Sequence, residues 1–246
     1  MTRSIGKHIL LEVCVDDLAG LEAAIGGGAD RIELCSALAL GGLTPSAGLM
    51  EVAATFDIPC NAMIRPRAGD FVYTDEETDI MLADIEAARN AGLAGVVLGA
   101  SLPDGRLDRM VLDRLVKAAR GLDLTLHRAF DLVPGIPEAV EIAVKLGFSR
   151  ILTSGGAKTA NEGFAGLSKA VSAAKGQISI MPGSGISASN VEDILRRFSV
   201  TEIHASCSSE TKRDGIIQHL GFGSLIERRT DASIVQALKD KLSSLG

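Results

Sequence analysis

Short apolar runs alternate with longer amphipathic stretches along almost the whole chain. Brief apolar runs bounded by glycine or proline are typical of buried strands, whereas apolar residues that recur about every 3.6 positions indicate helices. This pattern predicts strands at Ile9–Cys14, Arg31–Cys35, Cys60–Arg65, Gly95–Leu98, Asp123–His127, Arg150–Thr153, Gln177–Met181 and Thr201–His204. It predicts helices at Asp17–Gly26, Ser46–Thr55, Asp75–Ala91, Asp108–Arg120, Pro137–Leu146, Asn161–Lys175, Ala188–Phe198 and Asp231–Leu245.

The order of these elements predicts an α/β protein, a single-domain (β/α)8 TIM barrel over residues 1–246. Strand–helix units that recur at a spacing of roughly 25 to 30 residues are the pattern of such a barrel. The rival architecture, a doubly wound open sheet, would favour a glycine-rich turn after the first strand. Here Val15-Asp16-Asp17 follows that strand, which favours the barrel.

Composition narrows the class of protein. The 246 residues include one tyrosine and no tryptophan, so the core must be aliphatic, and the net charge of −6 argues against a nucleic-acid partner. No apolar run is long enough for a membrane span, and Met1–Leu11 lacks the features of a signal peptide. Four cysteines in a chain of this length suit a reducing compartment, so we expect a cytoplasmic protein.

Polar residues gather at the predicted carboxyl ends of the strands, where barrels bind ligands. Side chains two apart in a strand share a face, so Glu12 with Cys14, and Glu33 with Cys35, are predicted to point into the barrel. Buried charges must pair, and we expect Glu12 and Glu33 to form a salt-bridge network with Arg65 or to meet a ligand. The candidate catalytic residues, should the protein be an enzyme, are Glu12, Glu33, Arg65, His127, Arg128, Asp131 and His204.

One hypothesis for these residues is an enzyme acting on a small phosphorylated or carboxylated compound. Glu12 or Glu33 would act as general base and His127 or His204 as acid or electrophile, while two arginines, Arg65 and Arg128, would hold the anion. Small residues in the turns after strands six, seven and eight could present backbone N–H groups to the same anion, although tight turns need glycine in any case. These anion-site candidates are Ser154, Gly155, Gly183, Ser184, Gly185 and Ser206.

A second hypothesis concerns the cysteines. Cys14 and Cys35 end strands predicted to be neighbours, so their two thiolates could hold a soft cation such as Cu(I) or form a disulfide on oxidation. Zinc would need further ligands, for which Glu12, Glu33, His127 and His204 are available without a diagnostic spacing. Cys60 is predicted to pack as a small apolar residue, and Cys207 could do either.

Several long stretches resemble the CutC copper homeostasis family over about residues 10–210. They are LEVCVDDLAGLEAAIGGGADRIELCSALALGGLTPSAGLM, MIRPRAGDFVYTDEE, GVVLGASLPDGRLD, LTLHRAFDLV, ILTSGGAKTANEG, IMPGSGI and EIHASC. The resemblance implies a (β/α)8 barrel, a cytoplasmic location and a role in copper handling. It also implies Cu(I) binding at Cys14 and Cys35, which match the family's cysteine positions.

The segment Ser208–Thr230 is the longest irregular stretch after a predicted strand. We expect it to form an ordered flap or a surface for a partner. A homo-oligomer, by default a dimer, is the expected assembly.

Overall fold

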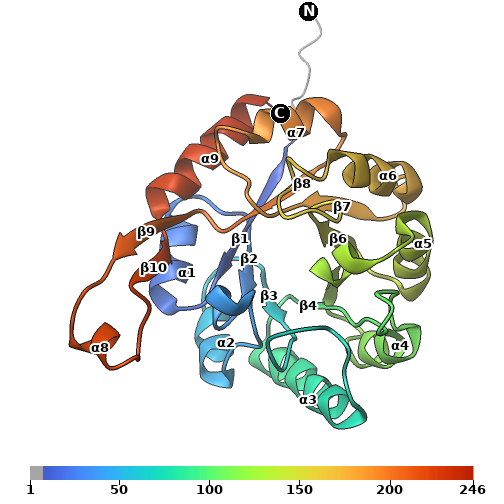
Figure 1. The fold of residues 1–246 in the computed structure, drawn as a ribbon, viewed down its shortest axis with the longest axis horizontal. Helices are drawn as coiled ribbons and strands as arrows, with labels where there is room; N and C mark the ends of the chain where they lie inside the picture. The colour runs from blue at the N-terminus through green and yellow to red at the C-terminus, as the bar shows by residue number, and fades with distance from the viewer. Residues whose placement is uncertain (1–7, 246) are drawn as a thin grey trace, which may run out of the picture.

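The computed structural model describes residues 8–245, so most of the stretch in which we expect no signal peptide lies outside it. Eight parallel strands curl into a nearly closed barrel with helices on its outside (Figure 1), and this architecture confirms the predicted TIM barrel. Neighbouring strands pair in the order β7-β6-β5-β4-β3-β2-β1-β8. The strands are β1 (Leu10–Val15), β2 (Arg31–Leu34), β3 (Cys60–Met63), β4 (Gly95–Leu98), β5 (Asp123–Leu126), β6 (Arg150–Thr153), β7 (Ser179–Pro182) and β8 (Glu202–Ala205).

The helices begin where side chains can cap them. Asp17 caps the first helix by accepting a hydrogen bond from the Gly20 N–H, and Thr74 forms a reciprocal capping box with Glu77 at the start of the third. The helices are α1 (Leu18–Gly26), α2 (Ala47–Ala53), α3 (Asp75–Ala91), α4 (Arg109–Ala118), α5 (Ile136–Leu146), α6 (Phe164–Ala174), α7 (Val191–Arg197), α8 (Ile216–His219) and α9 (Ala232–Leu245), with short 3-10 turns η1 (Leu38–Leu40) and η2 (Arg128–Leu132).

Three predicted strand ends extend too far. Cys35, Arg65 and His127 lie just beyond β2, β3 and β5, in the loops at the carboxyl end of the barrel. The Arg65 N–H, for example, donates to the Thr44 side chain instead of continuing the ladder with β4. The ladder stops because the backbone must turn outward there, and the polar side chains thus sit on loops around the barrel rim.

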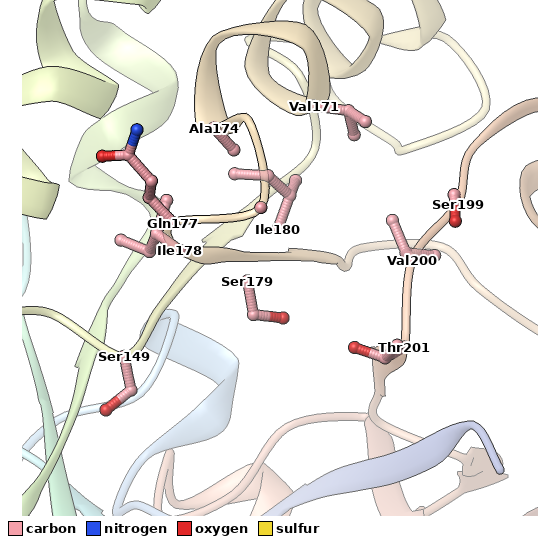
Figure 2. Close-up of a pocket in the computed structure, with 11 residues that line it drawn as sticks. Ser149, Val171, Ala174, Gln177, Ile178, Ser179, Ile180, Ser199, Val200 and Thr201 are labelled. Carbon is pink, nitrogen blue, oxygen red and sulfur yellow. The ribbon is translucent and has the colours of Figure 1, made fainter. Parts of the chain in front are cut away.

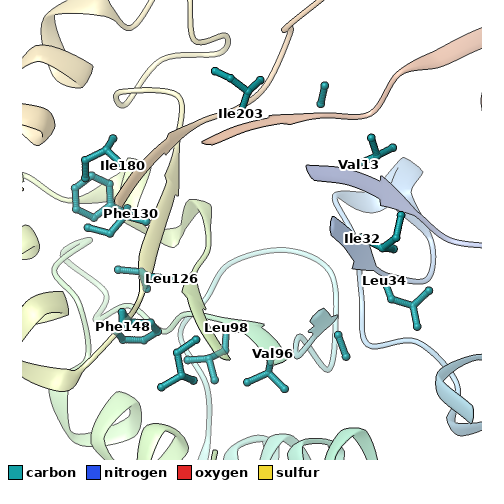
Figure 3. Packing of buried hydrophobic residues seen from close by; sticks show 14 of the residues in the cluster. Val13, Ile32, Leu34, Val96, Leu98, Leu126, Phe130, Phe148, Ile180 and Ile203 are labelled. Atoms are coloured by element: carbon teal, nitrogen blue, oxygen red, sulfur yellow. The ribbon is translucent and has the colours of Figure 1, made fainter. Parts of the chain in front are cut away.

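The main hydrophobic core lies outside the strands, between the barrel and its helices. Alternate strand residues such as Val13, Ile32, Leu34 and Ile203 are fully buried and belong to this core. Figure 3 shows such side chains arranged around the outside of the ring of strands. Because side chains alternate along a strand, the residues between them point into the barrel, and these are the polar ones.

Charges of alternating sign run through the barrel interior. The Arg150 guanidinium contacts Asp123 at 2.5 Å and Glu202 at 2.9 Å. Arg31 contacts the same Glu202 carboxylate at 2.5 Å and Glu12 at 2.5 Å. The register explains this, because Glu12 lies directly beside Arg31 of β2. We call the series Asp123–Arg150–Glu202–Arg31–Glu12 the interior charge chain.

The predicted network of Glu12 and Glu33 with Arg65 is therefore wrong. Glu12 pairs with Arg31, which starts β2 at the same level of the barrel. Arg65 lies at the rim, beyond the end of β3, and its guanidinium bonds to loop carbonyls instead.

The segment after β8 forms an arm that extends away from the barrel (Figure 1). It consists of β9 (Ser208–Lys212) and β10 (Ile226–Thr230), paired antiparallel, with α8 at the tip. Over residues 8–245, none of the helices combines the length and apolar character that crossing a membrane requires.

Several large apolar side chains of the arm are exposed. The expected homo-oligomer stays a prediction. The exposed large apolar residues of the arm are Ile216, Ile217, Leu220, Phe222, Leu225 and Ile226.

The interior charge chain predicts a large cost for removing Arg31, which links Glu202 to Glu12. Arg31→Ala removes the arginine partner of the fully buried Glu12 carboxylate and one of the two arginine partners of Glu202, so we expect a loss of about 3–5 kcal/mol in the free energy of unfolding. Urea denaturation measures this loss. The control is Arg106→Ala, which removes an exposed pair with Asp104 and should cost less than about 1 kcal/mol. Equal losses in the two variants would contradict a structural role for the interior charge chain.

Candidate functional site

A cavity of about 900 Å³ opens at the carboxyl ends of the strands, where the polar rim residues converge. The arm forms part of its wall through β10 and Ser224. The cavity is large enough for a small organic molecule. The remaining lining residues are Cys14, Asp16, Asp17, Glu33, Leu38, Ala39, Gly41, Met63, Arg65, Phe71, His127, Arg128, Leu152, Ser184, Gly185, His204, Ser206 and Ser208.

A second cavity, of about 640 Å³, lies at the opposite end of the barrel, beside the amino ends of β6, β7 and β8 (Figure 2). Apolar side chains and small hydroxyl groups such as Ser179 and Thr201 line it, with one amide, Gln177. Its lining offers no acid, base or thiol. The chemistry therefore belongs to the cavity at the carboxyl end.

Three potential metal ligands meet on one side of the larger cavity. The Cys14 sulfur, a Glu33 carboxylate oxygen and a His204 ring nitrogen all lie within 4.8 Å of one another. The His204 Nε2 atom is 3.8 Å from the Glu33 Oε2 atom. Adjacent strands create this group, which we call the thiol cluster, because Cys14 of β1 lies beside Glu33 of β2 and His204 lies on β8.

Glu12 orients the histidine of the thiol cluster. Its Oε1 atom lies 2.8 Å from His204 Nδ1, so the carboxylate holds the Nδ1 side and Nε2 faces Glu33. Burial alone would raise the pKa of Glu12, but the hydrogen bond from His204 and the charge of Arg31 lower it to about 2. Burial would lower the pKa of His204, yet the nearby Glu33 and Cys14 raise it well above its ordinary value. The pair thus favours a carboxylate beside an imidazolium when no metal is bound.

Cys35 lies behind the thiol cluster. Its sulfur is 3.6 Å from the Glu33 Oε2 atom, but the side chain is fully buried and packs in a small apolar cluster with Met63 and Val97. Burial raises the pKa of the Cys35 thiol well above its ordinary value, and the Glu33 charge adds to the shift. Cys14 is 7% exposed and lines the cavity, so it is the more accessible of the two sulfurs. The remaining thiols, Cys60 and Cys207, belong to the main hydrophobic core, and all four cysteines are free.

The same cavity is also lined by Arg65, Phe71 and His127, which we call the arginine wall. The Phe71 ring joins the other two, because its centroid lies 4.8 Å from the His127 ring and 4.9 Å from the Arg65 Cζ atom. The His127 ring also fills the space beside Gly99, where an added Cβ would approach it to 2.5 Å. Burial, reinforced by the charge of Arg65, lowers the pKa of His127 to about 3, so this imidazole is neutral at physiological pH.

Two of the predicted catalytic residues hold loops together. The Arg128 Nε–H donates to Asp131 at 2.7 Å, and one Nη donates to the Ser154 hydroxyl at 2.7 Å. Asp131 also accepts hydrogen bonds from the Thr153 hydroxyl and the Gly156 N–H. Arg128 still lines the cavity, whereas the Asp131 carboxylate is committed to the loop after β6.

The predicted anion-site residues divide into two groups. Ser184, Gly185 and Ser206 line the cavity. Ser154 binds Asp131 and Ala157, whereas the N–H groups of Gly155 and Gly183 donate to Thr153. The structure thus brings only the residues after β7 and β8 to the ligand space.

Sequence reasoning missed two important residues. Arg31 shares its strand face with Glu33, and this two-residue spacing was the signal that it also points inward. Phe71 gave no signal, because only the fold of the β3–α3 loop brings its ring against Arg65 and His127.

Comparison with known proteins places this geometry in a family. A model of the CutC family matches residues 9–209. A family protein CutC from Rhizobium meliloti (strain 1021) is 59% identical over 239 residues, covering 97% of this chain and 98% of the relative. The corresponding protein from Photobacterium profundum is 43% identical over 243 residues, covering 96% and 97%.

Solved structures agree with the fold. CutC from Streptococcus agalactiae, described as a candidate copper homeostasis protein, superposes with a TM-score of 0.76 at 34% identity and covers 80% of this chain and 98% of its own. Thiamine phosphate pyrophosphorylase from Pyrococcus furiosus has a TM-score of 0.59 at 16% identity, covering 97% and 98%, and this likeness concerns the fold alone.

The neutral, buried His127 predicts a pH dependence of stability. Its pKa falls from 6.5 in the unfolded chain to about 3 in the fold, so below pH 6.5 the unfolded state binds the proton first. Stability should therefore fall as the pH drops from about 6.5 to 3, and in His127→Gln this slope should be smaller by up to about 1.4 kcal/mol per pH unit. Urea denaturation at several pH values measures it. The variant His219→Gln, on the exposed α8, should keep the wild-type slope, and an unchanged slope in His127→Gln would contradict the assignment.

Proposed function

The chain belongs to the CutC family, and we propose that it is a cytoplasmic protein that binds Cu(I) at the carboxyl end of its barrel. In this proposal Cys14 is the principal ligand, His204 and Glu33 complete the thiol cluster, and Cys35 is the neighbouring second sulfur. The observation that carries the proposal is the approach of the Cys14, Glu33 and His204 ligand atoms to within 4.8 Å of one another.

The donor set favours a soft or borderline metal. Thiolate suits Cu(I) and zinc, imidazole suits both, and neither ligand type is preferred by magnesium or calcium. Metal–ligand bonds of about 2.0–2.3 Å require the three atoms to move only slightly closer than they are now. A metal would also compensate the cost of burying the Glu33 carboxylate beside the Cys14 thiol.

The position of Glu12 supports the same proposal. Histidines that bind metals commonly donate their other ring N–H to a carboxylate, which fixes the ring and its tautomer. Here Glu12 occupies that position at Nδ1, and Nε2 is directed toward Glu33. The interior charge chain in turn holds Glu12 in place through Arg31.

Cys35 requires a rearrangement before it can act. Its sulfur contacts Glu33 at 3.6 Å, so a shift of that carboxylate would let Cys35 approach a metal held by Cys14. Its buried environment disfavours the thiolate, and a bound cation would offset that cost. The description of the Streptococcus agalactiae relative as a candidate copper homeostasis protein favours Cu(I), and the free cysteines suit the cytoplasm.

Anaerobic titration with Cu(I) against a chromogenic competitor tests the proposal. We expect the wild-type protein to bind about one Cu(I) per chain and Cys14→Ser to lose stoichiometric binding, because the most accessible thiolate is gone. Glu12→Gln should bind about 10- to 100-fold more weakly, since it removes the group that orients His204.

The matched control is Cys60→Ser, which changes a buried thiol in the main core and should leave Cu(I) binding unchanged. Cys35→Ser should weaken Cu(I) binding where Cys35 is a second ligand, and it should leave the affinity unchanged where Cys35 only packs. Retention of stoichiometric Cu(I) by Cys14→Ser would overturn the proposal. A parallel titration with Zn(II) checks the metal, and tighter zinc binding would reject the copper assignment while keeping the site.

A further inference from the structure

We propose that the arginine wall binds the carboxylate of a small organic molecule that occupies the cavity beside the thiol cluster. The site is distinct from the metal ligands, and the proposal does not rest on copper binding. The wall contains a buried charge, that of Arg65, which no carboxylate of the described residues neutralises.

Arg65 is 5% exposed, and no carboxylate oxygen of residues 8–245 lies within the 4.0 Å limit of an ion pair with its guanidinium. The other buried arginines differ, because Arg31 and Arg150 each contact two carboxylates. Burying an unpaired charge is costly, and proteins normally pair it. An anionic ligand would supply the missing partner.

Neutral carbonyl groups hold the Arg65 side chain in position. One Nη donates to the carbonyl oxygens of Leu40 and Gly42 at 3.0 and 3.2 Å, and the other donates to Gly69 at 2.7 Å. These bonds fix the guanidinium between two loops and leave its positive charge uncompensated. The Nε atom is buried and makes no hydrogen bond of normal geometry among the described residues, and the buried Tyr73 hydroxyl nearby is likewise without a partner.

The acids that line the same cavity make their contacts with groups other than Arg65. Asp16 and Asp17 accept backbone N–H hydrogen bonds, the latter as the cap of α1. Glu227 pairs with two arginines of the arm, and Glu33 belongs to the thiol cluster. None of these four acids pairs with Arg65, and the free Glu33 Oε1 atom is no exception, so the Arg65 charge has no carboxylate partner among the residues that line the cavity.

His127 adds a second donor to the wall. Its Nδ1 atom accepts a hydrogen bond from the Ala129 N–H at 3.1 Å, which places the single ring proton of the neutral imidazole on Nε2. That Nε2–H is buried and has no acceptor within the part of the chain that the structure describes. An unsatisfied buried donor costs about 1–3 kcal/mol, which a ligand oxygen would recover.

The composition of the wall selects a carboxylate over a phosphate. It offers one positive charge and two N–H groups without a hydrogen-bond partner, on Arg65 Nε and His127 Nε2. A carboxylate carries one negative charge and two acceptor oxygens, so it could neutralise the charge and accept from both N–H groups. A phosphate dianion would leave a net negative charge in a cavity that already contains Glu33. The Phe71 ring between Arg65 and His127 provides an apolar surface for the carbon atoms next to the carboxylate.

The test is an NMR titration of metal-free protein that follows the His127 ring signals, with probes from formate through acetate and propionate to benzoate. Each carboxylate is compared with its neutral amide, and inorganic phosphate is titrated in parallel. We expect at least one carboxylate to bind at least about tenfold more tightly than its amide, because only the anion neutralises Arg65. Arg65→Gln should weaken the binding of that carboxylate by at least about tenfold. Arg65→Lys keeps the positive charge but loses the planar guanidinium with its paired N–H donors, so it should weaken binding by less.

The matched control is Arg106→Gln, an exposed arginine outside the cavity, which should bind as the wild type does. Equal affinity for every carboxylate and its amide would overturn the proposal, as would unchanged binding in Arg65→Gln. Tighter binding of phosphate than of any carboxylate would reject the carboxylate assignment. The comparison of acid with amide uses the wild-type protein, so it holds even if Arg65→Gln does not fold.

The titration is repeated on Cys14→Ser, which lacks the principal proposed copper ligand. We expect the carboxylate affinity to be unchanged in this variant, because Cys14 lies in the thiol cluster and not in the arginine wall. Loss of carboxylate binding in Cys14→Ser would contradict the separation of the two sites. A failure of copper binding would therefore leave this result intact.

Discussion

The structure depends on a buried chain of alternating charges inside the barrel. An ordinary TIM barrel fills its interior with branched aliphatic side chains, whereas here Asp123, Arg150, Glu202, Arg31 and Glu12 pair in series across it. Each member is costly to bury alone and acceptable only with its neighbours. The barrel therefore needs a defined register among strands that are far apart in the sequence. That register also fixes the positions of the side chains at the carboxyl end of the barrel.

The interior charge chain ends at Glu12, which also contacts His204, a residue that lines the cavity. Glu12 contacts Arg31 with one oxygen and His204 with the other, so a group that stabilises the barrel also sets the orientation of a cavity residue. The hydrophobic core takes little part in this, because it lies outside the strands (Figure 3). Stability and site geometry are thus joined through one carboxylate.

The two sides of the cavity have opposite characters. The thiol cluster gathers a sulfur, a carboxylate and an imidazole, and it is suited to a cation. The arginine wall holds an uncompensated cation and an imidazole kept neutral by burial, and it is suited to an anion. Both line one cavity of about 900 Å³, and the arm forms part of its wall. The two proposals together assign a metal ion and a small organic acid to one cavity, which the family name alone would not suggest.

The sequence by itself determined the order of strands and helices, the barrel, and the inward direction of Glu12, Cys14 and Glu33, because periodicity and strand parity are local properties. Only the tertiary structure decided the partners. It paired Glu12 with Arg31 rather than Arg65, placed Cys35 behind Glu33, and brought Phe71 between Arg65 and His127. These contacts depend on the stagger of neighbouring strands and on the path of loops. A difference of one residue in either changes which charges meet, and no local pattern records it.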